Sequence, residues 1–131
     1  MREEAAGERK MNGEQEGKAN RRRTGSQWEG RAAYFLEQAG YQILWGNFSC
    51  RQGEIDLIAR EGTYLVFIEV KYRRNLGSGS PLEAVNPAKQ EKIRRTALYY
   101  LYCRGYDEDT PCRFDVVAVT GERFALIRNA F

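Results

Sequence analysis

Two charged residues, Glu69 and Lys71, stand two positions apart inside a nearly continuous apolar run, LVFIEVKY. The run is otherwise typical of a strand covered on both faces, and the two-residue period of a strand puts both charged side chains on one face. Burying a carboxylate and an ammonium is costly unless each ion finds a partner. The pair therefore indicates a site that has a use for both charges: the carboxylate can hold a cation, and the ammonium can offset negative charge.

The preceding predicted strand supplies a second acid, Asp56. If residues 61–62 form a two-residue turn, Phe67 lies opposite Asp56, and Glu54 lies opposite Glu69. Asp56 and Glu69 are then diagonal neighbours on one face, with about 5 to 8 Å between their Cβ atoms, close enough to hold one cation. A register slip of one residue would send the two acids to opposite faces and destroy the site.

Two predicted helices carry further polar residues on their apolar sides. Glu29 lies within the apolar stripe of a helix over residues 27–39, where it either faces the sheet or only complements the helix dipole. Lys89 and Gln90 lie in the first turn of a helix over residues 87–104, near where a bound phosphate would sit. If Glu29 faces the sheet, both helices direct polar groups toward the strands that carry the two acids.

Three carboxylates and a lysine are what a phosphodiesterase that uses Mg²⁺ or Mn²⁺ needs. Oxygen ligands hold the ion, the ion polarises the phosphate and activates a water molecule, and the ammonium orients that water or offsets negative charge. From spacing alone, an ion network of Asp56, Lys71 and Glu69 that serves stability without catalysis remains the alternative.

The composition excludes several other classes of chemistry. With no histidine among its 131 residues, the chain has no Ser-His-Asp or Cys-His nucleophile and no zinc finger that needs imidazole. The three cysteines are odd in number and far apart, which fits a reducing cytoplasm rather than a disulfide framework. No apolar run is long enough to span a membrane and no signal peptide is evident, so we expect a soluble cytoplasmic protein without a membrane partner.

The pattern predicts one domain over residues 27–131, preceded by a charged, disordered tail over residues 1–26 that has almost nothing to bury. Residues 27–131 are nearly neutral in total, so their net charge is weak evidence for or against binding to nucleic acid. The expected order is α-β-β-β-α-β-β, an α/β fold with a mixed central sheet flanked by helices. The expected helices are 27–39 and 87–104, and the expected strands are 41–48, 53–60, 63–73, 113–119 and 123–129.

The motifs GEIDLIAR, FIEVKYR, NPAKQ and RFDVV together resemble the YraN-like family of small bacterial proteins. Through Asp56, Glu69 and Lys71 the chain also resembles the wider PD-(D/E)xK nuclease superfamily, whose signature is an acid on one strand and E-x-K on the next. The resemblance covers roughly residues 27–127, and Ile55 stands where the superfamily motif has proline. It implies a restriction-endonuclease-like three-layer fold, similar to that of archaeal Holliday junction resolvases.

The resemblance also implies roles for individual residues. Asp56 and Glu69 would bind Mg²⁺ or Mn²⁺, with the carbonyl of Val70 as a further ligand, and Lys71 would be the catalytic lysine. Glu29 matches the additional helix acid of the resolvase-like branch. Phosphate contacts are expected from basic and polar side chains around the site: Arg51, Arg73, Arg74, Lys89 and Gln90.

These expectations describe a metal-dependent nuclease that acts on structured or single-stranded DNA rather than RNA. The alternative is a non-catalytic nucleic-acid-binding module of the same fold that acts with a DNA-processing partner. Because related enzymes cut two strands with two sites, a homodimer is one expected arrangement. Asp115 is expected to be a buried partner of a basic side chain rather than a metal ligand, and Tyr99, Tyr100 and Tyr102 either stack on bases or pack in the core.

Overall fold

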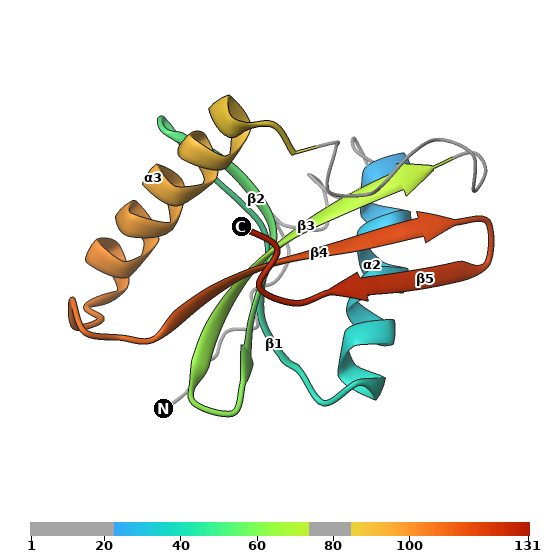
Figure 1. The fold of residues 1–131 in the computed structure, drawn as a ribbon, viewed down its shortest axis with the longest axis horizontal. Coiled ribbons are helices and arrows are strands. Elements are labelled where there is room, and N and C mark those ends of the chain that lie inside the picture. Colours follow the sequence, from blue (N-terminus) through green and yellow to red (C-terminus); the bar gives the residue numbers. More distant parts are fainter. Residues whose placement is uncertain (1–22, 74–84) are drawn as a thin grey trace.

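The computed structural model of the protein describes residues 23–73 and 85–131, with side chains from Gly30 onward in the first range. Five strands form one mixed sheet in the order β1-β2-β3-β4-β5, in which only the pair β3 and β4 is parallel. Helix α2 covers one face of the sheet and α3 covers the other (Figure 1). The elements are α2 (Arg23–Gln38), β1 (Gln42–Cys50), β2 (Gly53–Glu61), β3 (Tyr64–Arg73), α3 (Pro87–Arg104), β4 (Cys112–Thr120) and β5 (Arg123–Ile127).

This arrangement confirms the predicted α/β class, the order α-β-β-β-α-β-β and the restriction-endonuclease-like layering of helix, sheet and helix. Most element ends lie within two residues of their predicted positions. Helix α2 is the exception, because it begins at Arg23, four residues before its expected start. The rest of the predicted tail, residues 1–22, lies outside the described residues.

Helix α3 has the start and end signals that its sequence predicts. The side chain of Asn86 caps the first turn by accepting a hydrogen bond from the backbone N–H of Lys89 at 2.9 Å, and Pro87 follows as the first helical residue. Gly105 ends the helix in the left-handed conformation, and its N–H bonds back to Leu101 and Tyr102. The fixed start of α3 decides where its first-turn side chains lie relative to the sheet.

A separate hydrophobic core fills the space on each face of the sheet. Under α2, Leu36 packs with side chains of the central strands such as Val66 and Val117. Under α3, Ile93 and Tyr100 pack on Phe67 and its neighbours, and the rings of Tyr100 and Phe67 meet edge to face at 5.9 Å. The alternation of β3 residues between the two cores places Glu69 and Lys71 on the α3 face, together with Phe67.

The predicted register between β2 and β3 is wrong by two residues. Glu61 pairs with Tyr64, so the turn consists of Gly62 and Thr63 rather than residues 61–62. Gly62 has a φ of 61°, a left-handed conformation that glycine adopts at no steric cost in a two-residue hairpin turn. Phe67 therefore pairs with Ile58 and not with Asp56. Since the shift is an even number of residues, the paired residues 57–61 and 64–68 keep their predicted faces.

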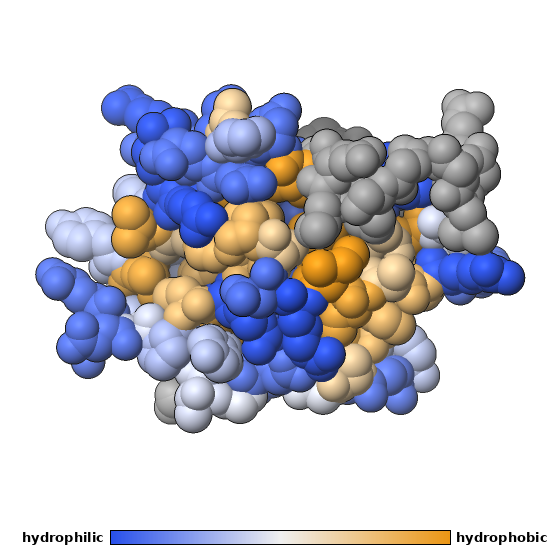
Figure 2. All heavy atoms as spheres, viewed as in Figure 1, coloured by the Kyte–Doolittle hydropathy of each residue, from blue (hydrophilic) through white to orange (hydrophobic). Residues whose placement is uncertain are grey.

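The surface shown in Figure 2 is mostly hydrophilic, with apolar side chains exposed between the polar ones, including some over α3 at the left of the view. No helix in residues 23–73 and 85–131 is long and apolar enough to cross a membrane.

Candidate active site

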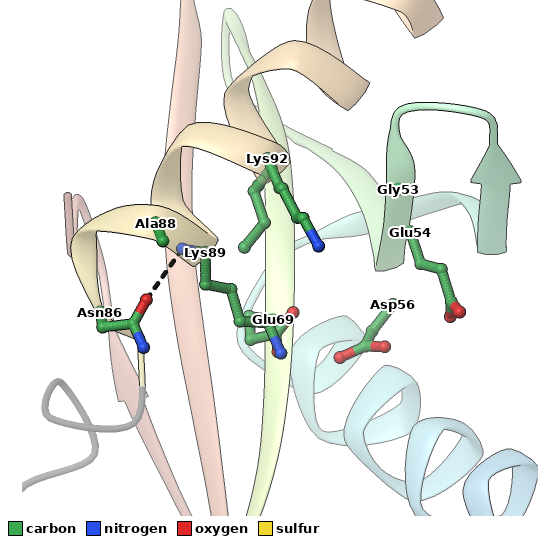
Figure 3. A pocket seen from close by; sticks show the side chains of 9 residues that line it. Gly53, Glu54, Asp56, Glu69, Asn86, Ala88, Lys89 and Lys92 are labelled. Carbon is green, nitrogen blue, oxygen red and sulfur yellow. Dashed lines mark hydrogen bonds and ion pairs between the residues drawn. The ribbon is translucent and has the colours of Figure 1, made fainter.

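A pocket of about 530 Å³ lies between β2, β3 and the first turns of α3. Figure 3 shows its acidic side chains on the strands and its basic side chains on the helix. The lining residues are Gly53, Glu54, Asp56, Glu69, Asn86, Ala88, Lys89, Lys92 and Ile93. The structure thus brings the two predicted metal-binding acids, Asp56 and Glu69, into one cavity.

Asp56 sits where β2 and β3 separate. The paired residues of these strands end at Leu57 and Ile68, and one position further Asp56 Oδ2 accepts a hydrogen bond from the backbone N–H of Val70 at 2.8 Å. Continuing the register would place Asp56 directly opposite Glu69. The predicted pairing of Glu69 with Glu54 is therefore wrong, while Asp56 and Glu69 both line the pocket.

Glu69 is almost buried, with 7% of its side chain exposed, and it is the centre of an ion network. Its Oε2 lies 3.3 Å from Lys71 Nζ and 2.8 Å from Lys89 Nζ. The two lysines are 24% and 42% exposed, so both ammonium groups also reach water. One oxygen of one carboxylate thus holds two cations, one from its own strand and one from α3.

The electrostatics of the pocket keep Lys89 charged. Burial by itself lowers the pKa of Lys89, but the hydrogen bond to Glu69 and the charges of Glu69 and Asp56 raise this pKa above its ordinary value of 10.5. Lys89 is therefore an ammonium at neutral pH, and it adds a partly exposed positive charge to the lining of the pocket.

The other predicted site residues have different positions. Arg51 is exposed in the turn between β1 and β2, and Arg73 ends β3. Gln90 turns away from the pocket and donates its amide to the carbonyl of Val85 at 2.9 Å, so it supports the start of α3. Arg74 and the side chain of Glu29 lie outside the described residues, and their predicted roles remain predictions.

Two further charged residues, Glu54 and Lys92, line the pocket, and of these Glu54 had no predicted role in the site. Glu54 precedes Asp56 by two positions on β2, and Lys92 follows Lys89 by one turn of α3. Figure 3 shows Lys92 reaching from the helix toward the space between Glu69 and Asp56. The two-residue period of a strand could have identified Glu54, because it puts Glu54 on the same face as Asp56. The helix period likewise puts Lys92 on the same side of α3 as Lys89, because residues i and i+3 share a helix face.

Gly53 explains how α3 can approach the start of β2 so closely. Its φ is 152°, and a Cβ atom at this position would lie 2.9 Å from Thr96 Oγ1. Thr96 is completely buried and donates its hydroxyl to the carbonyl of Lys92 at 2.8 Å, so it has little freedom to move away. A glycine here lets the helix lie against the strand that carries Asp56.

The donor set of the pocket suits a hard divalent cation. Asp56 and Glu69 offer carboxylate oxygens, and Mg²⁺ in proteins is commonly held by one or two carboxylates together with substrate phosphates. Within the described ranges, no three acidic, cysteine or histidine side chains converge closely enough to hold one ion. A metal ion here would therefore rely on two described carboxylates supplemented by backbone, water or phosphate oxygens.

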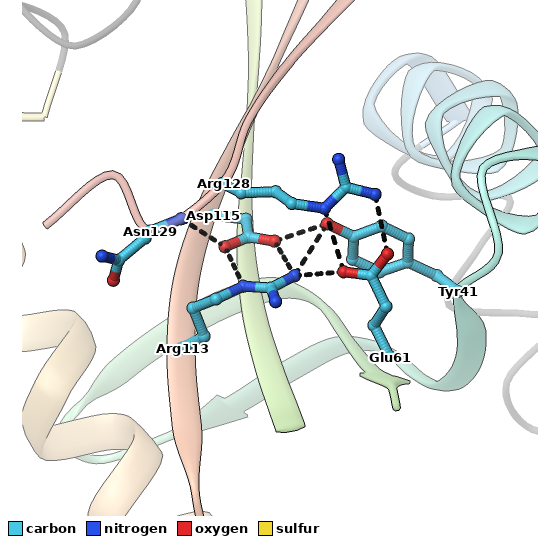
Figure 4. A network of polar contacts seen from close by, with 6 residues as sticks. All are labelled: Tyr41, Glu61, Arg113, Asp115, Arg128 and Asn129. Atoms are coloured by element: carbon cyan, nitrogen blue, oxygen red, sulfur yellow. Dashed lines mark hydrogen bonds and ion pairs between the residues drawn. The ribbon is translucent and has the colours of Figure 1, made fainter. Parts of the chain in front are cut away.

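A second buried carboxylate, Asp115, lies on the opposite face of the sheet (Figure 4). It accepts hydrogen bonds from Arg113 Nε at 2.9 Å, from Arg113 Nη2 at 2.8 Å, from the Tyr41 hydroxyl at 2.6 Å and from the backbone N–H of Asn129 at 2.9 Å. The prediction that Asp115 pairs with a basic side chain is confirmed. Its oxygens are fully engaged by the fold and do not face the pocket.

The comparisons with known proteins point to one family. A family model described as "Uncharacterised protein family UPF0102" matches residues 28–119, a range that contains every residue lining the pocket. A UPF0102 protein of Lachnoclostridium phytofermentans is 52% identical over 112 residues, which cover 86% of this chain and 95% of the relative. A UPF0102 protein of Acetivibrio thermocellus is 47% identical over 131 residues, covering 92% and 100% of the two chains. One from Klebsiella pneumoniae is 45% identical over 112 residues, covering 84% and 87%.

Proposed function

This chain belongs to the UPF0102 family, the YraN-like group that its motifs resemble, and we propose that it is a metal-dependent nuclease that hydrolyses phosphodiester bonds in nucleic acid. One observation carries the proposal. Asp56 and Glu69 line the same pocket, and Lys71 Nζ lies 3.3 Å from Glu69 Oε2. Two acids that can share a cation, beside an ammonium, form the minimal set for metal-assisted phosphodiester hydrolysis.

Asp56 and Glu69 would hold Mg²⁺ or Mn²⁺, with the Val70 carbonyl and Glu29 as candidate additional ligands. When bound, the cation would polarise the scissile phosphate and make a bound water more acidic. The protein itself positions the two carboxylates. The hydrogen bond from Val70 N–H fixes the Asp56 carboxylate, and the near-complete burial of Glu69 limits competition from water.

The basic residues in and beside the pocket have different roles in this proposal. Lys71, held beside Glu69, orients the attacking water and offsets negative charge that develops on the phosphate. Lys89 and Lys92 project from the first turns of α3 and bind phosphate oxygens next to the reacting one. Arg51 and Arg73, together with Arg74, would contact phosphates further along the strand.

We expect DNA with branched or single-stranded features as the substrate rather than a fixed duplex sequence. The residues that the structure describes form one α/β unit, and no second unit that could read a base sequence lies among them. The three free cysteines support action in a reducing cytoplasm. A homodimer would let two sites act on two strands.

The proposal is tested by cleavage of labelled single-stranded, duplex, flap and four-way-junction DNA in Mn²⁺, Mg²⁺ or EDTA. The wild type should cut at least one substrate in metal and none in EDTA, and Glu69→Gln and Lys71→Ala should each lose about 100-fold or more of this rate. Glu122→Gln, at a carboxylate that is 91% exposed, is the matched control and should cut normally. Cutting that survives both pocket substitutions would contradict the assignment.

One observation favours the alternative of a binding module without catalysis. Glu69 is already neutralised by Lys71 and Lys89, so the cluster is balanced without a metal ion. A folded wild type that binds the same DNA substrates and cuts none of them in Mn²⁺ or Mg²⁺ would establish this alternative and rule out the nuclease.

A further inference from the structure

A second groove, of about 340 Å³, lies on the outer side of α3 against the turn between β1 and β2. We call it the aromatic groove. Three of its side chains are large, apolar or aromatic, and exposed: Tyr102 at 83%, Leu98 at 65% and Tyr99 at 43%. Its lining residues are Gln52, Arg95, Leu98, Tyr99 and Tyr102.

These side chains are not part of the hydrophobic core. The buried side of α3 is formed by Ile93, Thr96, Ala97 and Tyr100. Of the three tyrosines that the sequence left open between packing and base stacking, Tyr100 is a core residue, whereas Tyr99 and Tyr102 face outward. Large aromatic side chains that are exposed to solvent can stack against a ligand with flat, apolar faces.

The groove is partly preorganised. The ring of Tyr99 lies 6.5 Å from the ring of Phe48 on β1, so one side of this tyrosine rests on the protein while 43% of the residue stays exposed. Arg95, one helical turn before Tyr99, adds a positive charge to the lining. Aromatic faces next to an arginine are the combination that binds unpaired bases and their phosphates.

The aromatic groove lies next to the pocket that contains Glu69, because neighbouring residues line the two cavities. Gln52 lines the groove and the next residue, Gly53, lines the pocket, while on α3 Lys92 lines the pocket and Arg95 lines the groove. At about 1.5 Å per residue, the helix advances about 15 Å from Lys92 to Tyr102. That length matches about four stacked nucleotides at about 3.4 Å each.

We propose that the aromatic groove binds the unpaired bases of a single nucleic acid strand, by stacking on Tyr99 and Tyr102, next to the phosphodiester bond held in the pocket. This inference rests on the proposed function and specifies its substrate as a strand with at least a few unpaired nucleotides. A second copy of the chain is a poorer occupant, because a stable protein interface uses about 20 to 30 residues a side and five residues line this groove.

The test is the binding of fluorescein-labelled oligo-dT of about twelve nucleotides, followed by fluorescence anisotropy in EDTA, where no cleavage occurs. The double variant Tyr99→Ala/Tyr102→Ala should lose about tenfold or more in affinity, because each stacked base contributes about 1 to 3 kcal/mol. Its affinity for a blunt duplex of the same length should change by less than about twofold. Tyr34→Ala, at a tyrosine on α2 that is 65% exposed, is the matched control and should bind oligo-dT normally.

The variant Tyr99→Phe/Tyr102→Phe separates stacking from hydrogen bonding, because it keeps both rings and should keep the affinity for oligo-dT. Equal losses for oligo-dT and duplex, unchanged binding by the alanine variant, or loss in the phenylalanine variant would each overturn the inference. Since binding is measured in EDTA, a protein that binds oligo-dT through the groove yet never cleaves would overturn the proposed nuclease and leave the groove assignment standing.

Discussion

The two buried carboxylates on the central strands differ in how completely the fold satisfies them. Asp115 on β4 is 0% exposed and receives four hydrogen bonds from the protein, two of them from one guanidinium. Glu69 on β3 is 6% exposed, and its Oε2 contacts two ammonium groups that are themselves partly in water. The two acids lie on opposite faces of the same sheet, one enclosed and one facing a pocket.

This difference separates a structural charge from one that is available for chemistry. The Asp115 network is closed around its buried acid, because Arg113, the cation of Asp115, is only 13% exposed. Arg113 also binds Glu61, which accepts two hydrogen bonds from Arg128 at 3.0 and 2.7 Å (Figure 4). Only these outer members, Glu61 at 23% and Arg128 at 47%, reach water. The Glu69 network ends at solvent, so its lysines stay hydrated when they move to another anion, while the buried Glu69 then needs another cation beside it. Breaking a buried ion pair costs several kcal/mol of stability, whereas breaking an exposed pair costs about 1 kcal/mol or less.

The largest expected effect is the loss of stability on opening the closed network. Arg113→Leu leaves the Asp115 carboxylate buried without its cation, so the free energy of unfolding should fall by about 3 to 5 kcal/mol. The measurement is urea unfolding followed by circular dichroism. Asp115→Asn keeps the size of the side chain and gives up its charge, and it should lose less, which makes the effect measurable even if Arg113→Leu does not fold.

A surface pair provides the reference for this prediction. Arg31 and Glu122 form an ion pair at 2.7 Å, with side chains 40% and 91% exposed, so Glu122→Gln should change the free energy of unfolding by less than about 1 kcal/mol. If Arg113→Leu cost no more than Glu122→Gln, the description of the Asp115 network as a closed structural unit would be wrong.

The next effect is a dependence of stability on pH that arises at Glu61. Hydrogen bonds from Arg128, followed by those from Arg113, lower the pKa of Glu61 from 4.5 to about 2, although burial opposes this. A carboxyl whose pKa is lower in the folded state contributes stability above its unfolded pKa, and this contribution is lost as the pH falls from about 4.5 toward 2. Urea unfolding at several pH values should show about 2 kcal/mol of this loss in the wild type. The loss should be absent in Glu61→Gln and should persist in Glu122→Gln.

The closed network also shows how far the sequence alone could be interpreted. The two-residue alternation of RFDVVAV placed Asp115 on the buried face with Val117 and Val119, and burial required a basic partner. The same alternation puts Arg113, two positions away, on the face of Asp115, but it does not select Arg113 among the basic side chains that could reach this acid. Long side chains can reach several neighbours, and the choice among them depends on the whole tertiary structure.

For the candidate site, too, the sequence predicts which residues share a face but not the exact register of the strands. Strand and helix periods placed Glu69, Lys71 and Lys89 correctly, because faces follow from the period and not from the exact register. The pairing of Phe67 with Asp56 and of Glu69 with Glu54 was predicted wrongly because the position of Gly62 in its turn was misjudged. A glycine can occupy either central position of such a turn, so local sequence leaves the register ambiguous by two residues.

A smaller effect on stability is expected at the open network. Glu69→Gln leaves Lys71 and Lys89 without their anion, but both side chains reach water and can be solvated there. The free energy of unfolding should therefore change by less than about 1 kcal/mol in the same urea assay that reveals the loss in Arg113→Leu. A loss of 3 kcal/mol or more would break the comparison and make Glu69 a structural residue like Asp115.

The smallest expected effect concerns Lys89, which occupies Glu69 Oε2 at 2.8 Å in the structure described here. If Asp56 and Glu69 bind a divalent cation, the Lys89 ammonium competes with that ion for the same oxygen. Lys89→Ala should then bind Mn²⁺ about two to five times more tightly in isothermal titration calorimetry without DNA, since a partly exposed ion pair contributes up to about 1 kcal/mol. Lys92→Ala removes a charge that lines the same pocket one turn further along α3 and should have a weaker effect. Equal gains in both variants would mean that Lys89 acts through general electrostatics alone, and weaker Mn²⁺ binding in Lys89→Ala would show that Lys89 orders Glu69 for the metal instead of competing with it.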